Sequence, residues 1–302
     1  MLIPTCEIEL TNRCNANCLM CPRDQLERPF GEMDIDTFKL VADKAAQYGT
    51  KNIALSGFGE PLLNARIADY IKYVKDHYPH INVNITTNAA LLKRGLAEEL
   101  ALAGLNEIQI SFNGWDKDSY EKLMRGLSFE TVMKNLRDLK EITDKYGKPA
   151  IRFIPVLSKV MGKEQFHKMK SLLSGLGYGP ESFIGYYICH NRCGYYTDPE
   201  VVDQEFYDKH NVKTHPIEQV LCRVPFLFNW VDWQGRAHLC CNDIKDKMIL
   251  GDLKVLSFKD IEQKKVDLLY SQKVPEICRF CNLPFTMGER AGYVLKGKKY
   301  LK

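Results

Sequence analysis

The sequence lacks the features that mark secreted, membrane-spanning and low-complexity proteins. No apolar run reaches the ~18 residues that a membrane span needs. The first ten residues, MLIPTCEIEL, show no basic region followed by a long apolar run, so no signal peptide is predicted. Charge of one sign does not dominate, since 42 Lys and Arg residues stand against 38 Asp and Glu residues. Nothing in this balance favours nucleic acid or a membrane surface as a partner, and we expect a soluble, cytoplasmic protein.

Cysteine, by contrast, is abundant. Eleven cysteines occur in 302 residues, a length that allows one large domain or two. In a small secreted domain they would predict a disulfide framework. In a longer chain without a signal peptide, their clustered spacing indicates metal binding or catalysis.

The first two thirds of the chain alternate strand-like segments with helix-like ones. Between the strands, apolar residues recur at helical spacing, as they do over residues 35–48, 67–78 and 129–146. Six such units predict an α/β fold with a parallel sheet, either doubly wound or barrel-like. Short apolar runs bounded by Gly, Asn or Pro predict the buried parallel strands at residues 5–10, 52–56, 82–87, 107–112, 151–157 and 182–188.

After Tyr195 the character of the sequence changes. Residues 197–216 are polar and are predicted to form a connection. A hairpin is predicted in FLFNWVDWQGRAHLCC, turning at Asp232–Gly235, followed by a helix near residues 257–272 and the segment CRFC. We therefore divide the chain into residues 1–195 and a small cysteine-bearing module at residues 196–302.

Three cysteines lie within one loop after the first predicted strand, in TNRCNANCLMCP. Three thiolates from Cys14, Cys18 and Cys21 can hold three corners of a [4Fe–4S] cluster and leave the fourth iron open for chemistry. Structural zinc is the alternative. It usually takes four protein ligands and pairs of the Cys-x2-Cys type, which the Cys-x3-Cys-x2-Cys spacing fits poorly.

This spacing in this position resembles the radical S-adenosylmethionine (radical SAM) enzymes. The resemblance implies a partial (β/α)6 TIM-like barrel in which S-adenosylmethionine chelates the open iron. Reductive cleavage of the cofactor, with an electron from an external flavodoxin- or ferredoxin-type donor, then yields a 5′-deoxyadenosyl radical that abstracts a substrate hydrogen. The residue before the third cysteine is often aromatic in this family, whereas here it is Met20, whose thioether can still pack against a ring.

Further residues add to this resemblance. The run SGFGEPLL ends the second predicted strand, where two glycines let a backbone approach a ligand and a glutamate can accept from an ammonium. It resembles the family motif that binds the methionine amine. Polar residues at later strand ends, where barrel ligands bind, and an arginine after the fourth strand are further candidates. The cofactor-binding residues implied are Gly57, Phe58, Gly59, Glu60, Asn88, Ser111, Asn113 and Arg125.

The second set of cysteines flanks the predicted hairpin. Cys222 and Cys240 bracket it, and the pair Cys278 and Cys281 follows the next helix, a spacing that suits zinc or a second iron–sulfur cluster. The pattern resembles the auxiliary-cluster half of the SPASM family in its shorter "twitch" form, which implies a second [4Fe–4S] cluster. Since neighbouring residues of a hairpin point to opposite faces, only one of Cys240 and Cys241 is expected to ligate, and the spacing from the hairpin glycine favours Cys240.

This arrangement resembles enzymes that oxidise or epimerise a small polar molecule, such as an aminocyclitol dehydrogenase. We expect oxidation of a small polar alcohol, with no nucleic-acid or membrane partner. Two free cysteines after the sixth predicted strand, Cys189 and Cys193, are candidate catalytic thiols, because a thiol can return a hydrogen atom and so support an epimerase. The sequence is also compatible with a peptide-modifying SPASM enzyme and with a redox or metal-binding protein without radical chemistry.

Overall fold

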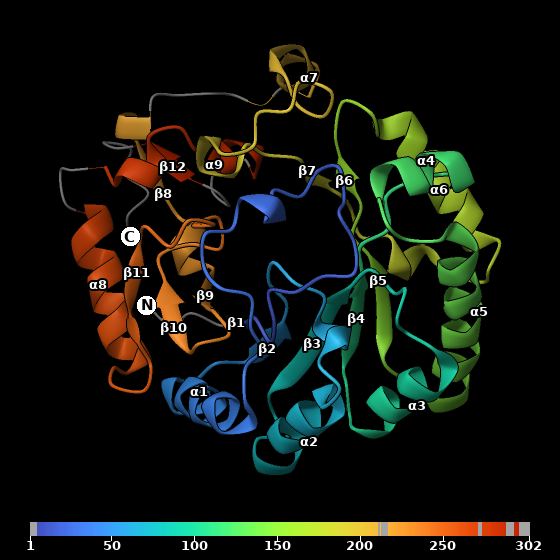
Figure 1. The fold of residues 1–302 in the computed structure, drawn as a ribbon, viewed down its shortest axis with the longest axis horizontal. Coiled ribbons are helices and arrows are strands. Elements are labelled where there is room, and N and C mark those ends of the chain that lie inside the picture. The colour runs from blue at the N-terminus through green and yellow to red at the C-terminus, as the bar shows by residue number, and fades with distance from the viewer. Residues whose placement is uncertain (1–4, 211, 213–216, 271–273, 288–292, 296–302) are drawn as a thin grey trace.

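A curved sheet with helices on its outer side organises the chain (Figure 1). The structure is a computed structural model that describes residues 5–210, 212, 217–270, 274–287 and 293–295. The main sheet has eight strands in the order β11-β10-β9-β1-β2-β3-β4-β5. Adjacent strands are parallel in the part of the sheet that runs from β9 through β1 to β5. The pairs β9–β10 and β10–β11 are antiparallel.

The strands of the main sheet are β1 (Thr5–Ile8), β2 (Asn52–Leu55), β3 (Asn82–Thr87), β4 (Glu107–Ile110), β5 (Ala150–Phe153), β9 (Phe228–Val231), β10 (Arg236–His238) and β11 (Ile249–Asp252). Two smaller sheets pair β6 (Val156–Leu157) with β7 (Tyr187–Ile188), and β8 (Val220–Cys222) with β12 (Tyr293–Leu295). The helices are α1 (Ile35–Tyr48), α2 (Ile67–His77), α3 (Arg94–Leu102), α4 (Lys117–Leu123), α5 (Phe129–Tyr146), α6 (Lys163–Ser174), α7 (Gln204–Lys209), α8 (Phe258–Tyr270) and α9 (Leu283–Thr286). None of the helices in the described ranges has both the length and the apolar character that a membrane crossing requires.

The predicted α/β fold is confirmed, and two of its predicted strands differ in extent. The fifth predicted strand, residues 151–157, is divided into β5 and β6 around Pro155, which has no N–H to give to a ladder. The sixth, residues 182–188, is extended only over β7, because a 3-10 turn that begins at Pro180 takes up its start. β7 pairs in parallel with β6, so the succession of parallel strands still ends where the sequence predicted it.

Capping residues fix the ends of the outer helices. Helix α1 begins after Asp34, whose side chain accepts from the Thr37 N–H, and ends at Gly49 with φ 89°. Helix α5 begins after Ser128 and ends at Gly147 in the same left-handed conformation. The stripes predicted for residues 35–48, 67–78 and 129–146 are confirmed as α1, α2 and α5 (Figure 1).

The two faces of the main sheet differ in polarity. Alternate residues of β1 to β5 are buried, and all of these except Thr87 are apolar and belong to one core together with the helices. The residues between them face the inside of the curve and hydrogen-bond with one another. Thr86 donates to Gln109 and Ser56 donates to Glu7 across strands, and Gln109 donates to Glu107 within β4. The polar inner face consists of Glu7, Ser56, Asn84, Thr86, Glu107, Gln109 and Arg152.

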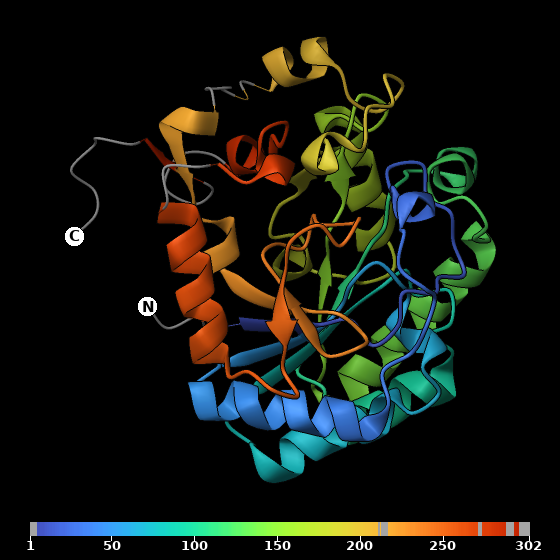
Figure 2. The ribbon, with the colours of Figure 1, turned by 60° about the vertical axis from the view of Figure 1, so that its left-hand side comes forward.

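The predicted hairpin is confirmed as β9 and β10, and it extends the main sheet. Val231 pairs with Ala237 across the hairpin and with Ile8 of β1 on its other side. Helix α8 lies along β11 and α1 and is described as far as Tyr270, so the last residues of the predicted segment 257–272 lie outside the described residues (Figures 1 and 2). Its Lys265 is fully buried and donates to the Pro225 carbonyl at 2.7 Å and to Asn229 Oδ1 at 2.9 Å.

Candidate functional site

Three free thiols converge in the loop between β1 and α1, as the sequence predicted. Cys14, Cys18 and Cys21 are partly buried, and the Cys21 N–H donates to the Cys18 carbonyl at 3.0 Å. Burial raises the pKa of Cys18 to about 12, and the neighbouring Cys21 and Cys14 thiols add to the rise. The three thiols are therefore near enough to affect one another, and none forms a disulfide. This arrangement fits a cluster with three cysteine ligands.

The rest of the molecule holds this loop through its backbone. The Asn17 N–H donates to the Arg125 carbonyl at 2.8 Å, and the Leu19 N–H donates to the Leu123 carbonyl at 2.9 Å. The Tyr196 hydroxyl donates to the Leu19 carbonyl from the segment after β7. These hydrogen bonds tie the loop to the C-terminal end of α4 and to the segment after β7. In Figure 1 it lies over the middle of the ring of strands.

The glycine motif after β2 packs directly against this loop. A Cβ on Gly59 would lie 2.1 Å from the Thr11 carbonyl oxygen, and one on Gly57 would lie 2.7 Å from Glu9 Cβ. The Glu60 N–H donates to the Arg13 carbonyl at 2.8 Å. Only glycine lets the two segments approach this closely, whereas the sequence suggested these glycines for the close approach of a ligand.

Glu60 is buried and already engaged by its neighbours. Its carboxylate accepts from Thr87 Oγ1 at 2.6 Å, from the Asn88 N–H at 2.9 Å and from the Leu62 N–H at 3.1 Å. Burial raises the pKa of Glu60 to about 7 despite these hydrogen bonds. The residue thus ties the motif to the end of β3, whatever further contact it makes to a ligand.

The other predicted cofactor residues lie around the same loop. The Asn88 amide donates to Asn15 Oδ1 at 2.8 Å, and the Asn113 amide donates to Met124 Sδ at 3.3 Å, which also accepts from the Cys18 thiol at 3.7 Å. Ser111 is partly exposed just past β4. The Arg125 side chain is exposed, and its charge acts on Tyr196, which holds the loop.

The second set of cysteines also converges. Cys222 at the end of β8, Cys240 after β10, and Cys278 and Cys281 around a 3-10 turn interact electrostatically with one another. Burial raises the pKa of Cys222, and the Cys240 and Cys281 thiols add to that rise. The four predicted ligands therefore meet in one place. All are free thiols, as a cluster with four cysteine ligands requires.

The argument used to separate Cys240 from Cys241 does not apply in the structure. Strand β10 ends at His238, so neither cysteine has the alternating orientation of a strand. Instead, the Cys241 thiol hydrogen-bonds with Cys240, and this contact raises the pKa of Cys241. The ladder between β10 and β11 bulges at Ala237 and His238, and no residue pattern in the sequence predicts that bulge.

The two predicted catalytic thiols lie in different surroundings. The Cys193 thiol donates a hydrogen bond to Cys281, within the second set of cysteines. Cys189 is buried, and its pKa rises to about 11, chiefly through burial, with a contribution from Cys21 of the first set. The turn around Cys193 is strained, since Arg192 and Cys193 have φ values of 46° and 59°.

Sequence reasoning missed the contacts that hold this turn in place. Asn191 and Asn282 each donate a backbone N–H to the other's side-chain oxygen, at 2.8 Å and 3.1 Å. The Asn191 amide also donates to the Phe280 carbonyl. These bonds fix the segment after β7 against the Cys278–Cys281 turn, and no local sequence signal announces a pairing over such a distance.

Comparison with known families agrees with both sets of cysteines. The sequence model of the Radical SAM superfamily matches residues 8–160, and that of SPASM, an iron–sulfur cluster-binding domain, matches residues 222–282. A probable GTP 3′,8-cyclase from Methanococcus maripaludis is 29% identical over 136 residues, 45% of either chain. Another from Saccharolobus solfataricus is 28% identical over 181 residues, 56% of this chain and 58% of the relative. The chain thus spans about half the length of these curated relatives.

Solved structures share the fold at low sequence identity. anSMEcpe, solved with AdoMet and the Cp18Cys peptide, has a TM-score of 0.69 at 15% identity, over 96% of this chain and 92% of that one. BtrN, solved with AdoMet and 2-DOIA, has a TM-score of 0.60 at 18% identity, over 93% and 94% of the two chains. SuiB from Streptococcus suis, bound to the precursor peptide SuiA, has a TM-score of 0.68 at 15% identity, over 93% and 70%.

Three structural features agree with the two family matches. They are the loop that holds three thiols, the glycine motif packed against it, and the four thiols gathered at the hairpin. The chain belongs to the radical SAM superfamily and carries a SPASM iron–sulfur cluster-binding domain, and its cofactors are S-adenosylmethionine and [4Fe–4S] clusters.

Proposed function

We propose that this protein abstracts a hydrogen atom from a small polar substrate and oxidises an alcohol to a carbonyl. The polar inner face of the sheet carries the proposal, because its carboxylates, amides and hydroxyls suit a ligand rich in hydroxyl or amino groups. An aminocyclitol or a sugar is such a ligand. BtrN, which shares the fold, was solved with 2-DOIA as well as AdoMet.

We assign the first cluster to Cys14, Cys18 and Cys21 and the auxiliary cluster to Cys222, Cys240, Cys278 and Cys281. S-adenosylmethionine bound at the first cluster supplies the chemistry of hydrogen abstraction in this superfamily. Gly57, Phe58, Gly59 and Glu60 would hold its methionine end, with Asn88, Ser111, Asn113 and Arg125 around it. The electron for cofactor cleavage would come from an external one-electron donor. We further propose that residues 1–195 form the part that binds the first cluster and residues 196–302 the part that binds the auxiliary cluster.

Oxidation also requires a group that takes up the substrate proton. Glu7 lies on the inner face of β1, hydrogen-bonds Ser56, and lies near the positive charge of Arg192. Burial raises the pKa of Glu7, which brings a carboxylate closer to the neutral range in which a general base is effective. We assign this role to Glu7, with the auxiliary cluster as the electron acceptor.

Two other reactions have specific support. Cys189 lies buried toward the first set of cysteines, where a thiol could return a hydrogen atom and make the enzyme an epimerase. Peptide modification is supported by the shared fold of anSMEcpe and SuiB, both solved with peptides. The curated relatives named GTP 3′,8-cyclase match this chain over only about half of their length. Their activity is a third candidate, which the partial match supports less directly.

The test is anaerobic reconstitution with iron and sulfide, followed by assay of 5′-deoxyadenosine with aminocyclitols, sugars, GTP and peptides. The proposal expects substrate-dependent 5′-deoxyadenosine and a product lighter by two hydrogens with a polyol. Turnover with only GTP or only peptides would overturn the substrate class. Failure to form 5′-deoxyadenosine under all conditions would overturn the radical reaction itself.

A further inference from the structure

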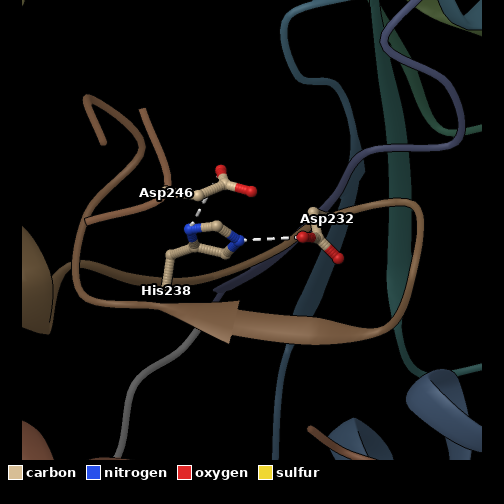
Figure 3. A group of neighbouring side chains, drawn as sticks. All are labelled: Asp232, His238 and Asp246. Carbon is tan, nitrogen blue, oxygen red and sulfur yellow. Dashed lines mark hydrogen bonds and ion pairs between the residues drawn. The ribbon is translucent and has the colours of Figure 1, made fainter. Parts of the chain in front are cut away.

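A buried network of charged side chains joins the SPASM hairpin to the glycine motif. Figure 3 shows its hairpin part, where His238 lies between Asp232 and Asp246. His238 Nε2 is 2.9 Å from Asp232 Oδ2, and the Arg236 guanidinium reaches Asp232 at 2.7 Å and Asp246 at 2.6 Å. Burial alone would lower the pKa of His238, but its hydrogen bond to Asp232 and the nearby carboxylates of Asp243 and Asp246 outweigh burial and raise it.

The carboxylates of this group are already paired with arginines, so we do not propose a metal site here. Their ligand atoms lie within 4.8 Å of one another, as they would around an ion. However, Asp246 accepts from Arg28 at 2.9 Å as well as from Arg236, and Asp232 accepts from Arg236. Two guanidinium groups already neutralise the carboxylates and would repel a cation.

Arg28 carries the network from the hairpin to the loop that bears the first three cysteines. Its side chain is 1% exposed, and it donates to both Glu9 carboxylate oxygens, at 2.9 Å and 3.0 Å, while its other terminal nitrogen donates to Asp246. The guanidinium lies 5.3 Å from the ring centroids of Phe58 and Trp230. It is thus held between the glycine motif and β9.

Glu9 completes the connection to the glycine motif. Its Oε2 accepts from the Phe58 N–H at 2.9 Å, and its backbone N–H donates to the Val231 carbonyl at 2.9 Å. Its side chain occupies the space that a Cβ on Gly57 would need. The backbone position of the motif therefore depends on where the Glu9 carboxylate is held.

We propose that Arg28, Glu9 and Asp246 are positioning residues through which the SPASM hairpin sets the affinity for S-adenosylmethionine. This inference rests on the proposed assignment of Gly57–Glu60 to the methionine end of that cofactor. Loss of the Arg28 guanidinium would leave Glu9 as a buried, unpaired carboxylate beneath the motif. Loss of the Asp246 charge would weaken the contact between Arg28 and the hairpin while leaving the bond from Arg28 to Glu9.

The experiment uses the anaerobically reconstituted holoenzyme. It measures the Kd for S-adenosylmethionine by equilibrium dialysis, iron per chain, and the change that the cofactor causes in the EPR signal of the reduced first cluster. Arg28→Met is expected to weaken binding about tenfold or more with iron unchanged, which corresponds to at least ~1.4 kcal/mol. Asp246→Asn is expected to weaken it by a smaller factor, and Arg28→Lys to restore part of the loss.

A double variant and a surface pair serve as controls. Arg28→Met combined with Glu9→Gln removes the unpaired charge and should bind more tightly than Arg28→Met alone. Lys247→Met removes an exposed bond of 3.3 Å to Glu27, which joins the same two segments at the surface. This exposed pair should contribute little, so binding should remain as in the wild type.

Each outcome decides a separate question. If the wild-type holoenzyme with full iron does not bind S-adenosylmethionine, the proposed function fails. If the wild type binds S-adenosylmethionine and both Arg28→Met and Asp246→Asn bind it as tightly as the wild type, the network has no positioning role. In that case this inference alone fails. If Arg28→Met does not assemble its clusters, Asp246→Asn decides, and an unchanged Kd for that variant overturns the inference.

Discussion

The thiol of Cys193 is hydrogen-bonded to the sulfur of Cys281, although the two residues lie on opposite sides of the polar connection at residues 197–216. With Cys241, which contacts Cys240, six thiols therefore meet where four suffice for a cluster. A hydrogen bond to a ligand sulfur raises the reduction potential of an iron–sulfur cluster.

We predict that Cys193→Ala retains the iron of the auxiliary cluster and lowers its reduction potential. The measurement is a redox titration followed by EPR, beside an iron count, with Cys222→Ala as the comparison that should lose iron. Iron loss in Cys193→Ala as large as in Cys222→Ala would instead identify Cys193 as a ligand.

Replacing Cys14, Cys18 and Cys21 together with Ala should remove about four of roughly eight irons per chain. The auxiliary thiols are separate from this loop, so their iron should remain. The measurement is iron and sulfide per chain with assay of 5′-deoxyadenosine, which should disappear. Continued formation of 5′-deoxyadenosine by the triple variant would show that another site binds the cofactor.

Alanine at Cys240 should damage the auxiliary cluster, whereas alanine at Cys241 should cost little iron. The family spacing places Cys240 as the ligand, and Cys241 is bonded to it as a neighbour. Iron analysis and the absorbance of the reconstituted variants compare the two directly. Equal iron loss would mean that both thiols, or the bond between them, are needed to assemble the site.

Gly59→Ala should prevent the glycine motif from packing against the cysteine loop, because its Cβ would lie 2.1 Å from the Thr11 carbonyl oxygen. We expect a loss of about 1–3 kcal/mol in the free energy of unfolding, together with weaker binding of S-adenosylmethionine. Gly95→Ala is the matched control, since a Cβ there meets nothing within 4 Å in an exposed turn of α3, and it should be neutral or slightly stabilising. Urea unfolding of the apoprotein measures both, and equal stability of the two variants would contradict the close approach.

Turnover in deuterated water separates oxidation from epimerisation. Oxidation should give a carbonyl product lighter by two hydrogens and without solvent deuterium at carbon. Epimerisation should give a product of unchanged composition that carries one deuterium. If a deuterated epimer forms and Cys189→Ala abolishes it, that thiol is the hydrogen donor and the dehydrogenase proposal is wrong.

The sequence identified the elements whose chemistry is local. Cys14, Cys18 and Cys21 lie in one loop, and the glycine motif follows a strand, so spacing and strand order sufficed to predict where they meet. The Arg28–Asp246 contact could not be predicted in this way, because it joins distant segments and neither residue belongs to a motif. The surroundings of Cys189 and Cys193 could not be predicted either, because they depend on the turn at Arg192. Arg192 has a left-handed backbone conformation, which sequence reasoning would expect at a glycine.

The pairing of β1 with β9 has a consequence for synthesis of the chain on the ribosome. The first strand emerges early, but its partner on one side is made only after residue 228, which takes roughly 10 to 45 seconds at ~5–20 residues per second. During that interval β1 is an unpaired edge that can pair with another nascent chain. A protein truncated before β9 would keep this edge permanently and should aggregate, so the last third of the chain protects the first strand as well as binding iron.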